Sequence, residues 1–299
     1  MKLALLTGFN GFLGKYIHNI LKNYYVVSTL SRNTGDYQIY LEQQVPIFVE
    51  KFDFVVHAAG KAHSIPKTEF EKQEFYRTNI IGTRNLLEGL NKTSIPKYFV
   101  FISTVSVYGQ EVGCNIDENN DLAAVDPYGL SKIAAEQLVS DWCNSNNVVC
   151  TILRLPLVVG SNPPGNLGAL IKGLQKGYYF NIDQGKARKS MVLAEDVAKA
   201  IINVGEIGGI YNLTDGYHPS FLEISSHISL QLGKKKPMNI PLWLAQIIAI
   251  FGNLLGKNAP LNSYKLNKII SDLTFDDNKA RKSFGWNPTS VLNGLNFNE

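Results

Sequence analysis

The chain has 299 residues, and its 45% hydrophobic content is that of an ordinary globular protein. This length allows one large α/β domain or two small ones with a real core. The net charge is +4 and the basic residues are scattered, with Lys234 to Lys236 as the longest run, so we do not expect nucleic-acid binding.

Three cysteines, Cys114, Cys143 and Cys150, show no metal-ligand spacing and cannot all pair with one another. We therefore expect no metal site and a reduced, cytoplasmic compartment. The N-terminus enters a predicted strand at once, so we expect no secretory leader.

The first predicted elements are a strand, a turn and a helix. Residues 2–6 form an apolar run, typical of a strand buried on both faces of a parallel sheet. Gly8, Gly11 and Gly14 follow at three-residue spacing, and a helical pattern then continues to Leu21. Glycines let the backbone approach a pyrophosphate, and a helix N-terminus offers free N–H groups to it. The spacing is not the commoner Gly-x-Gly-x-x-Gly, and a glycine-rich turn without a ligand is the alternative.

The second predicted strand, residues 25–30, ends in Ser31-Arg32-Asn33 rather than in an acidic residue. An acidic residue there usually holds the ribose hydroxyls of NAD, whereas an arginine suits the 2′-phosphate of NADP. The sequence thus favours NADP(H), with NAD(H) and an ordinary surface arginine as the alternatives.

The next segment is harder to assign. Residues 38–41 are the candidate third strand, with residues 45–51 as a short helix. Residues 54–60 form the fourth strand and end in Ala58, Ala59 and Gly60, which are small enough to let a cofactor lie close to the backbone. His63 then falls at the mouth of the crevice, although a lone histidine is more often structural.

The central elements carry the candidate chemistry. A long helix is predicted over residues 70–90, a fifth strand over 98–102 ending at Ser103 and Thr104, a helix over 127–143 and a sixth strand over 148–155. Tyr128 and Lys132 are four residues apart and share a helix face. An ammonium beside a phenol lowers its pKa, which suits it to proton transfer, although Tyr-x-x-x-Lys also occurs on exposed amphipathic turns.

After Pro156 the pattern changes to a loop rich in Pro and Gly, then a helix from Leu167. Residues 188–196 return to the core, with Asp196 capping or opening a helix to Val204, and residues 209–213 form the last core strand. Residues 220–299 are mostly helical. The apolar run 242–251 is too short to span a bilayer and predicts a buried or docking helix, with contact to a membrane surface as the alternative.

Taken together, these stretches resemble the extended short-chain dehydrogenase/reductases, the nucleotide-sugar epimerase and dehydratase family. The resemblance covers nearly the whole chain and is carried by six motifs: residues 7–14, 57–60, Asn79-x-x-Gly82-Thr83, residues 103–109, Tyr128-x-x-x-Lys132, and residues 277–286. It implies an α/β, Rossmann-type doubly wound parallel sheet (1–160 plus about 190–216) and a smaller, mostly helical substrate-binding domain (about 161–189 plus 217–299).

The resemblance also implies roles for individual residues. Thr104, Tyr128 and Lys132 would be catalytic. Residues of the turns and strand ends would bind the cofactor: Gly8, Asn10, Gly11, Phe12, Leu13, Gly14, Arg32, Ala58, Ala59, Gly60, Ser103, Tyr128, Lys132 and Pro156. Five residues would contact a UDP-sugar: His63, Thr104, Asn166, Arg188 and Lys189. Which of the two basic residues meets the diphosphate stays open, and so does a homodimer.

Two departures from the family pattern narrow the choice of reaction. Val105 and Ser106 follow Thr104 where dehydratases carry an Asp-Glu pair, so we do not expect loss of water. Leu157 replaces an asparagine that usually contacts substrate. With Arg32, this favours a 4-keto reductase over a 4-epimerase, in a resemblance closest to bacterial enzymes acting on UDP-2-acetamido-2,6-dideoxy sugars. A catalytically silent dinucleotide-binding regulator is the rival of another class.

Overall fold

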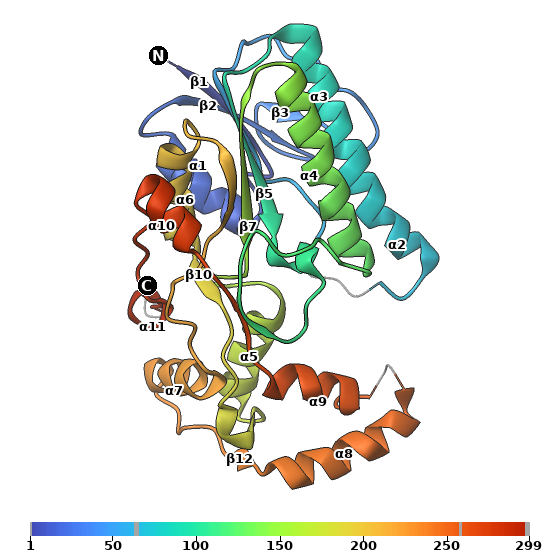
Figure 1. Cartoon of the computed structure of the whole chain (residues 1–299), viewed down its shortest axis with the longest axis vertical. Helices are drawn as coiled ribbons and strands as arrows, with labels where there is room; N and C mark the ends of the chain where they lie inside the picture. The colour runs from blue at the N-terminus through green and yellow to red at the C-terminus, as the bar shows by residue number, and fades with distance from the viewer. Residues whose placement is uncertain (1, 63–65, 257–258, 297–299) are drawn as a thin grey trace.

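A seven-stranded parallel sheet forms one end of the molecule (Figure 1). The computed structural model describes residues 2–62, 66–256 and 259–296. The strands are β1 (Leu3–Thr7), β2 (Val26–Ser31), β3 (Tyr37–Gln38), β4 (Phe54–His57), β5 (Tyr98–Thr104), β7 (Val149–Leu155) and β11 (Gly209–Asn212). Their order is β11-β7-β5-β4-β1-β2-β3, so the chain reverses direction across the sheet between β1 and β4. This confirms the predicted Rossmann-type α/β class.

Helices cover both faces of the sheet, as the apolar strand sequences require. On one face, α1 (Phe12–Leu21) and α6 (Ala194–Val204) pack on alternate strand residues such as Leu6 and Val56. On the other, α3 (Gly82–Thr93) and α4 (Pro127–Ser145) pack on the intervening residues, such as Leu5 and Phe99. The core therefore lies in two layers, one on each side of the strands.

Three predicted elements need correction. The third strand, β3, has two residues, and residues 45–51 form no helix, since Pro46 packs against Gly89 of α3 instead. The single helix predicted over 70–90 is three pieces: α2 (Glu69–Tyr76), a π-helical turn (Arg77–Ile81) and α3. A π-helical turn within a helix often marks a functional site.

Three two-stranded sheets connect the rest of the chain. They pair β8 (Leu157–Val159) with β10 (Met191–Leu193), β9 (Asn181–Ile182) with β12 (Asn239–Ile240), and β6 (Gly113–Ile116) with β13 (Leu273–Phe275). Four further helices are α5 (Gly165–Lys176), α7 (Phe221–Gln231), α10 (Asn278–Phe284) and α11 (Val291–Gly294). The first two form a second apolar core with β10. The domain boundaries given above stay a prediction.

Asp196 lies in the first turn of α6, so of the two predicted roles it opens this helix but does not cap it. The cap residue of α6 is Leu193, and the Asp196 carboxylate accepts a hydrogen bond from the Thr289 amide at 2.7 Å. Its role is to tie the C-terminal segment to α6.

The helices α8 (Leu242–Leu254) and α9 (Ser263–Ile270) lie at the end of the molecule opposite the sheet (Figure 1). In α8 only Ala245, Ala249 and Gly252 are buried, so of the predicted buried or docking helix the buried form is wrong, and the helix packs by one face against α9. Over the ranges that the structure describes, no helix combines the length and apolarity needed to cross a bilayer.

Candidate active site

The turn between β1 and α1 has a shape that only glycine allows. Gly8 has φ +73°, and a Cβ added there would stand 2.6 Å from the Ala59 amide nitrogen. A Cβ on Gly14 would stand 2.1 Å from the Gly8 carbonyl oxygen. Both distances are far below contact, so these glycines let the turn, the helix and the β4 exit lie against one another.

The N-terminus of α1 is open to an anion. The cap residue is Gly11, no side chain caps the helix, and its first turn contains no acidic residue. The amides of Phe12 and Leu13 have no acceptor within the helix, because the first turn never provides one. Together with the helix dipole, these N–H groups fit a phosphate group.

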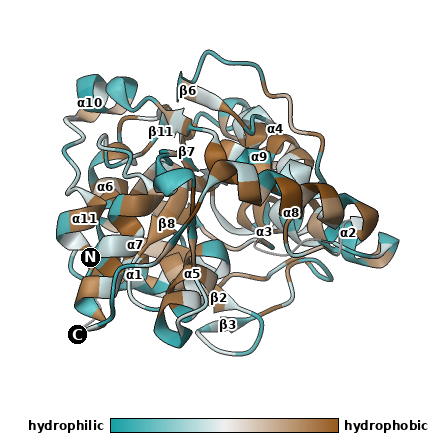
Figure 2. Cartoon of the chain, turned by 90° about the horizontal axis from the view of Figure 1, so that it is seen from below, coloured by the Kyte–Doolittle hydropathy of each residue, from teal (hydrophilic) through white to brown (hydrophobic). Residues whose placement is uncertain are grey.

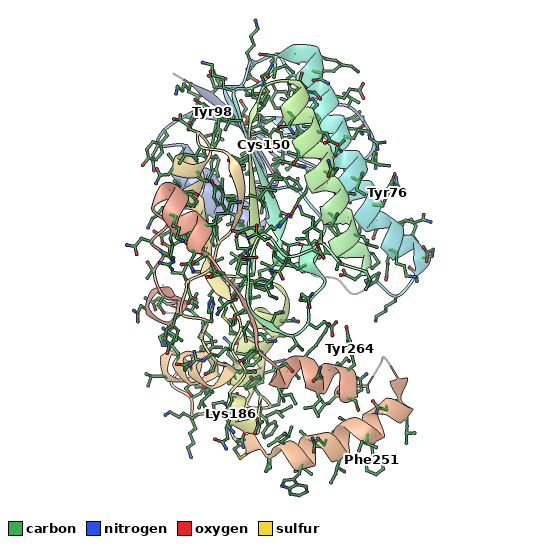
Figure 3. The ribbon with its side chains drawn as sticks, in the orientation of Figure 1. Tyr76, Tyr98, Cys150, Lys186, Phe251 and Tyr264 are labelled. Atoms are coloured by element: carbon green, nitrogen blue, oxygen red, sulfur yellow. The ribbon has the colours of Figure 1, made fainter. Side chains whose placement is uncertain are left out.

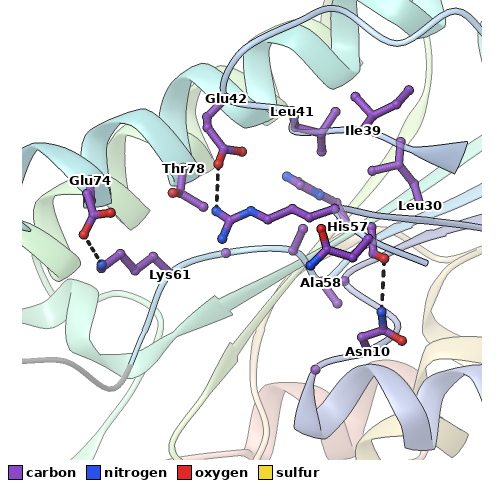
Figure 4. Close-up of a pocket in the computed structure, with 17 residues that line it drawn as sticks. Asn10, Leu30, Ile39, Leu41, Glu42, His57, Ala58, Lys61, Glu74 and Thr78 are labelled. Atoms are coloured by element: carbon purple, nitrogen blue, oxygen red, sulfur yellow. Dashed lines mark hydrogen bonds and ion pairs between the residues drawn. The ribbon is translucent and has the colours of Figure 1, made fainter. Parts of the chain in front are cut away.

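A cavity of about 430 Å³ adjoins this turn at the carboxyl edge of the sheet (Figure 4). It lies where β1 and β4 are neighbours, the place where open α/β sheets bind ligands. Seven predicted cofactor residues line it: Gly8, Asn10, Gly11, Arg32, Ala58, Ala59 and Gly60. The other seven do not line it: Phe12, Leu13, Gly14, Ser103, Tyr128, Lys132 and Pro156. Phe12 stacks edge-on against Tyr16 at 5.7 Å between ring centroids.

Arg32 is not free in this cavity. Its guanidinium forms an ion pair with Glu42 at 2.8 Å and lies 5.8 Å from the centre of the Tyr40 ring. In Figure 4 a dashed line to Glu42 marks this ion pair, and a second dashed line joins Lys61 to Glu74 at 2.5 Å. A 2′-phosphate would therefore have to compete with Glu42 for Arg32, and the NADP preference stays a prediction.

Thr104 and Tyr128 meet beyond this cavity. Thr104 is the last residue of β5, where its hydroxyl accepts a hydrogen bond from the Ser106 amide at 3.2 Å. Tyr128 stands in the first turn of α4, which Asp126 caps by accepting from the Tyr128 amide at 3.1 Å and the Gly129 amide at 3.0 Å. This cap fixes where the helix begins, and hence where the phenol points.

The electrostatics of this pair differ from the expectation. Burial raises the pKa of Tyr128 to about 12, and the bonded Thr104 hydroxyl opposes the rise only in part. Lys132 donates to the Ile102 carbonyl at 2.7 Å and lies 3.9 Å from the centre of the Phe101 ring. We expected Lys132 to lower the phenol pKa, whereas here burial dominates and the pKa of Tyr128 is raised. Burial lowers the pKa of Lys132 itself to about 7.

Asn79, in the π-helical turn, holds the two sides of the site together. Its Oδ1 accepts from the Lys61 amide at 2.7 Å, and its Nδ2 donates to the Lys61 carbonyl at 3.1 Å and to Ser131 Oγ at 2.8 Å. It thus joins the β4 exit to the turn of α4 that carries Tyr128. The motif Asn79-x-x-Gly82-Thr83 is visible in the sequence, but the sequence alone does not indicate this role for Asn79.

A buried ion pair lies one turn beyond Lys132. The Arg154 guanidinium donates to Glu136, with Nη2–Oε2 at 2.7 Å, and both side chains are at most 5% exposed. Ser103 Oγ also donates to Glu136, at 2.5 Å. Ser103 therefore positions this pair, and its hydroxyl is already engaged. No spacing in the sequence marks Glu136 as the partner of Arg154.

His57, at the end of β4, is buried between two hydroxyls. Its Nδ1 is 2.6 Å from Thr7 Oγ1 and its Nε2 is 2.9 Å from Thr83 Oγ1. Burial lowers the pKa of His57 to about 3, so the ring is neutral at physiological pH. Thr7 Oγ1 also accepts from the Ala59 amide at 3.2 Å, so this chain of bonds fixes the floor of the cavity.

The remaining predicted substrate residues differ in how exposed they are and in what they contact. Arg188 is exposed and engaged, donating to the His218 carbonyl at 2.9 Å and approaching Glu223 at 3.6 Å. Lys189 is half-buried, and burial lowers its pKa. Asn166 is exposed at the start of α5. His63 lies outside the described residues.

In the part of the chain that the structure describes, no three His, Cys, Asp or Glu side chains are grouped to hold a metal ion. The glycine turn, open helix terminus and cavity of the site fit a dinucleotide, and its Thr104 and Tyr128 hydroxyls fit an oxygen whose proton is exchanged.

Known proteins resemble this chain in sequence and in fold. A family model described as "NAD dependent epimerase/dehydratase family" matches residues 4–213. The UDP-glucose 4-epimerase of Vibrio cholerae is 27% identical over 97% of this chain and 92% of its own length. The N-acetyl-alpha-D-glucosaminyl-diphospho-ditrans,octacis-undecaprenol 4-epimerase of Escherichia coli O157:H7 is 28% identical over 74% of this chain and 70% of its own. A crystal structure of a UDP-glucose 4-epimerase from Thermotoga maritima superposes with a TM-score of 0.77 at 22% identity, covering 98% of this chain and 96% of that one.

Proposed function

The chain belongs to the NAD-dependent epimerase/dehydratase family, and we propose that it is a 4-epimerase that oxidises and re-reduces C4 of a nucleotide sugar. The observation that carries the proposal is the meeting of Thr104 and Tyr128 at the carboxyl end of β5, beside a cavity shaped for a dinucleotide. Relatives named as 4-epimerases support this choice over reduction.

A bound NAD(P) would supply the hydride acceptor and donor of this reaction. The chain's own residues would bind it: the Gly8 turn and the first amides of α1 at the diphosphate, and Ala58 to Gly60 along its length. Lys132 stands on the same face of α4 as Tyr128, one turn away, where its ammonium would hold the ribose hydroxyls.

The proton travels through Tyr128. Thr104 Oγ1 and Tyr128 Oη would both hydrogen-bond the oxygen on C4, which aligns that oxygen with the phenol. Tyr128 Oη then accepts the hydroxyl proton as C4 is oxidised, and returns it to the same oxygen as C4 is reduced. With a pKa of about 12 the buried phenol holds its own proton at rest, so the oxidative half of the cycle would begin only after Tyr128 has lost that proton, which a cation beside the phenolate would favour.

Elimination of water is not part of the proposal. That reaction needs an acid and a base beside C5 and C6 of the sugar, and the residues that follow Thr104 are Val105 and Ser106. Neither carries a carboxyl group, so Thr104 and Tyr128 have no such partners from this turn.

A 4-keto reductase is the second candidate, favoured by Leu157 in the place of the substrate-contacting asparagine. The two activities differ in how much cofactor they consume. An epimerase converts UDP-glucose or UDP-N-acetylglucosamine to its C4 epimer with a trace of cofactor and no net change in nicotinamide absorbance. A reductase leaves those sugars unchanged and consumes one reduced cofactor for each UDP-4-keto sugar. Binding of the dinucleotide without either activity would indicate the silent regulator.

The choice of cofactor depends on Arg32 and Glu42. We propose that Arg32 leaves Glu42 to meet a 2′-phosphate, since the Arg32 side chain is half exposed and ion pairs open to solvent contribute only about 1 kcal/mol or less. Glu42→Gln should then raise affinity for NADP(H) several-fold, and Arg32→Asp should shift the preference to NAD(H). If neither substitution changes the ratio of the two affinities, the pair has no part in selecting the cofactor.

Lys189 is our choice for the sugar diphosphate, because Arg188 is held by His218 and Glu223. A half-buried ammonium with a lowered pKa gains more from an approaching diphosphate than an exposed, paired guanidinium does. A homodimer and a cytoplasmic location stay predictions.

A further inference from the structure

The helix α8 presents its large apolar residues to solvent. Its three buried residues, Ala245, Ala249 and Gly252, lie on one face and pack toward α9 and the adjoining loop. The opposite face carries five large side chains that are 44–84% exposed: Trp243, Ile247, Ile250, Phe251 and Leu254. Figure 2 shows α8 in brown, the colour of hydrophobic residues, and Figure 3 places Phe251 at the far end of the molecule from Tyr98. A contiguous patch of this kind marks an interaction surface.

The charge around α8 is strongly positive. Residues 224–271 contain six lysines and no Asp or Glu, in a chain whose net charge is +4. The rest of the chain therefore carries a net charge of −2, so the basic balance belongs to this segment alone. Lys234, Lys235 and Lys236 are exposed a few residues before α8, and none has an ion-pair partner among the described residues. An apolar helix preceded by three exposed lysines is complementary to an anionic lipid surface.

The length of α8 decides how it would meet such a surface. Its 13 residues extend about 20 Å at 1.5 Å each, well short of the ~30 Å hydrocarbon core of a bilayer. The helix can therefore lie in the plane of the headgroups but cannot cross. Trp243 suits that depth, because its ring is apolar and its N–H is polar.

A second copy of the chain explains these features less well. A stable protein interface buries about 800 Å² on each partner, whereas one exposed face of a 20 Å helix offers a few hundred. Two such faces would also bring two segments of six lysines together, with no acidic residue in either. Repulsion between these like charges therefore opposes binding of a second copy of the chain, whereas attraction to an anionic lipid surface favours membrane binding.

We propose that α8 binds the surface of an anionic membrane, with Trp243, Ile250 and Phe251 inserted among the acyl chains and Lys234 to Lys236 on the headgroups. The position of α9 gives this a consequence for the cleft. Lys268 of α9 is paired at 2.8 Å with Glu111, which follows the β5 strand and Tyr108. The bound helix pair would thus hold the sugar end of the cleft beside the lipid surface. The inference does not depend on which sugar is the substrate.

Flotation of the full-length protein with lipid vesicles tests the proposal. We expect binding to vesicles containing phosphatidylglycerol, and little binding to pure phosphatidylcholine. Trp243→Ser with Phe251→Ser should lower the partition coefficient at least about tenfold. The matched control is Ile47→Ser with Val49→Ser, which removes two side chains that are 82% and 84% exposed elsewhere, and should leave binding unchanged. Replacing Lys234 to Lys236 with glutamine should lower binding at least about tenfold at low salt and less at high salt.

Two results would overturn the proposal. One is no binding to anionic vesicles by the unmodified protein. The other is an oligomer in lipid-free buffer that the α8 substitutions convert to monomer, which would identify a second copy as the occupant. If the double variant misfolds, brominated lipids decide instead. They should quench the fluorescence of the unmodified protein but not that of Trp243→Phe, and equal quenching of both would contradict the insertion of α8.

Discussion

At the nucleotide end of the cleft, the ligand surface is mainly backbone: the Gly8 turn, the amides that open α1 and the small residues after β4. At the proposed sugar end, we expect it to consist of side chains, chiefly the hydroxyls of Thr104 and Tyr128 and the ammonium of Lys189. The first end depends on conformations that glycine alone adopts without strain. The second depends on the protonation of groups whose pKa burial changes. Backbone shape should therefore determine cofactor affinity at the nucleotide end, and the protonation of side chains should determine activity at the sugar end.

The largest effect should come from Tyr128→Phe, which removes the proton carrier and leaves the shape of the site intact. We expect kcat to fall about 100- to 10,000-fold, while the affinity for the dinucleotide stays within a factor of about two. Steady-state kinetics and cofactor titration measure the two separately. The control is Tyr76→Phe, which changes an exposed tyrosine of α2. Full activity in Tyr128→Phe would remove Tyr128 from the mechanism.

Gly8→Ala tests the nucleotide end. The new Cβ meets the Ala59 amide at 2.6 Å, so we expect cofactor affinity to fall at least about tenfold, with a loss of stability of about 1–3 kcal/mol. Gly177→Ala is the matched control: its φ is +76° but nothing lies within 4 Å of the added Cβ. It should lose about 1 kcal/mol of stability and no cofactor affinity. Equal losses of cofactor affinity in the two variants would contradict this, because the contact of the new Cβ with Ala59 would then have no effect of its own on binding.

Lys132→Met should separate function from stability. Burial lowers the pKa of Lys132 to about 7, so between pH 7 and 10.5 the unfolded chain binds a proton that the folded chain does not. The unmodified protein should therefore gain stability with rising pH in this range, by up to about 1.4 kcal/mol per pH unit. The variant lacks this dependence. We expect it to be inactive, yet more stable by about 1–3 kcal/mol at pH 7, with the advantage shrinking toward pH 10. Denaturant melts at pH 7 and 9 would contradict this if the difference stayed constant.

The smallest effect concerns the two basic residues of the sugar end. Lys189→Met should raise the KM for the nucleotide sugar about tenfold. Arg188→Met should leave KM unchanged, because Arg188 donates to the His218 carbonyl and pairs with Glu223. The reverse pattern in initial-rate kinetics would assign the diphosphate to Arg188.

Sequence reasoning located the elements that depend on local pattern. The apolar strands, the Gly8 turn and the Asp126-capped helix are where we expected them, because each is specified by residues next to one another. It erred where distant contacts decide. Residues 45–51 are held by packing against α3 rather than by helical hydrogen bonds, and the π-helical turn around Asn79 has no local signature.

The chemistry of the site shows the same limit. The four-residue spacing of Tyr128 and Lys132 places both on one helix face, but the carbonyl of Ile102 and the ring of Phe101 decide where the ammonium goes. Glu136 was missed because its partner Arg154 comes from a strand 18 residues later, and nothing in the spacing joins them. The burial that shifts each pKa is likewise a property of the assembled core.

The account rests on redox exchange at C4 through the Tyr128 site, and UDP-glucose deuterated at C4 tests it most directly. Incubated with the protein and a trace of NAD(P), the sugar should yield its C4 epimer with the deuterium still at C4 and no net change in the cofactor, as mass spectrometry and NMR would show. Epimer that has lost its deuterium to water would contradict the account, since that outcome requires removal of a proton rather than a hydride from C4.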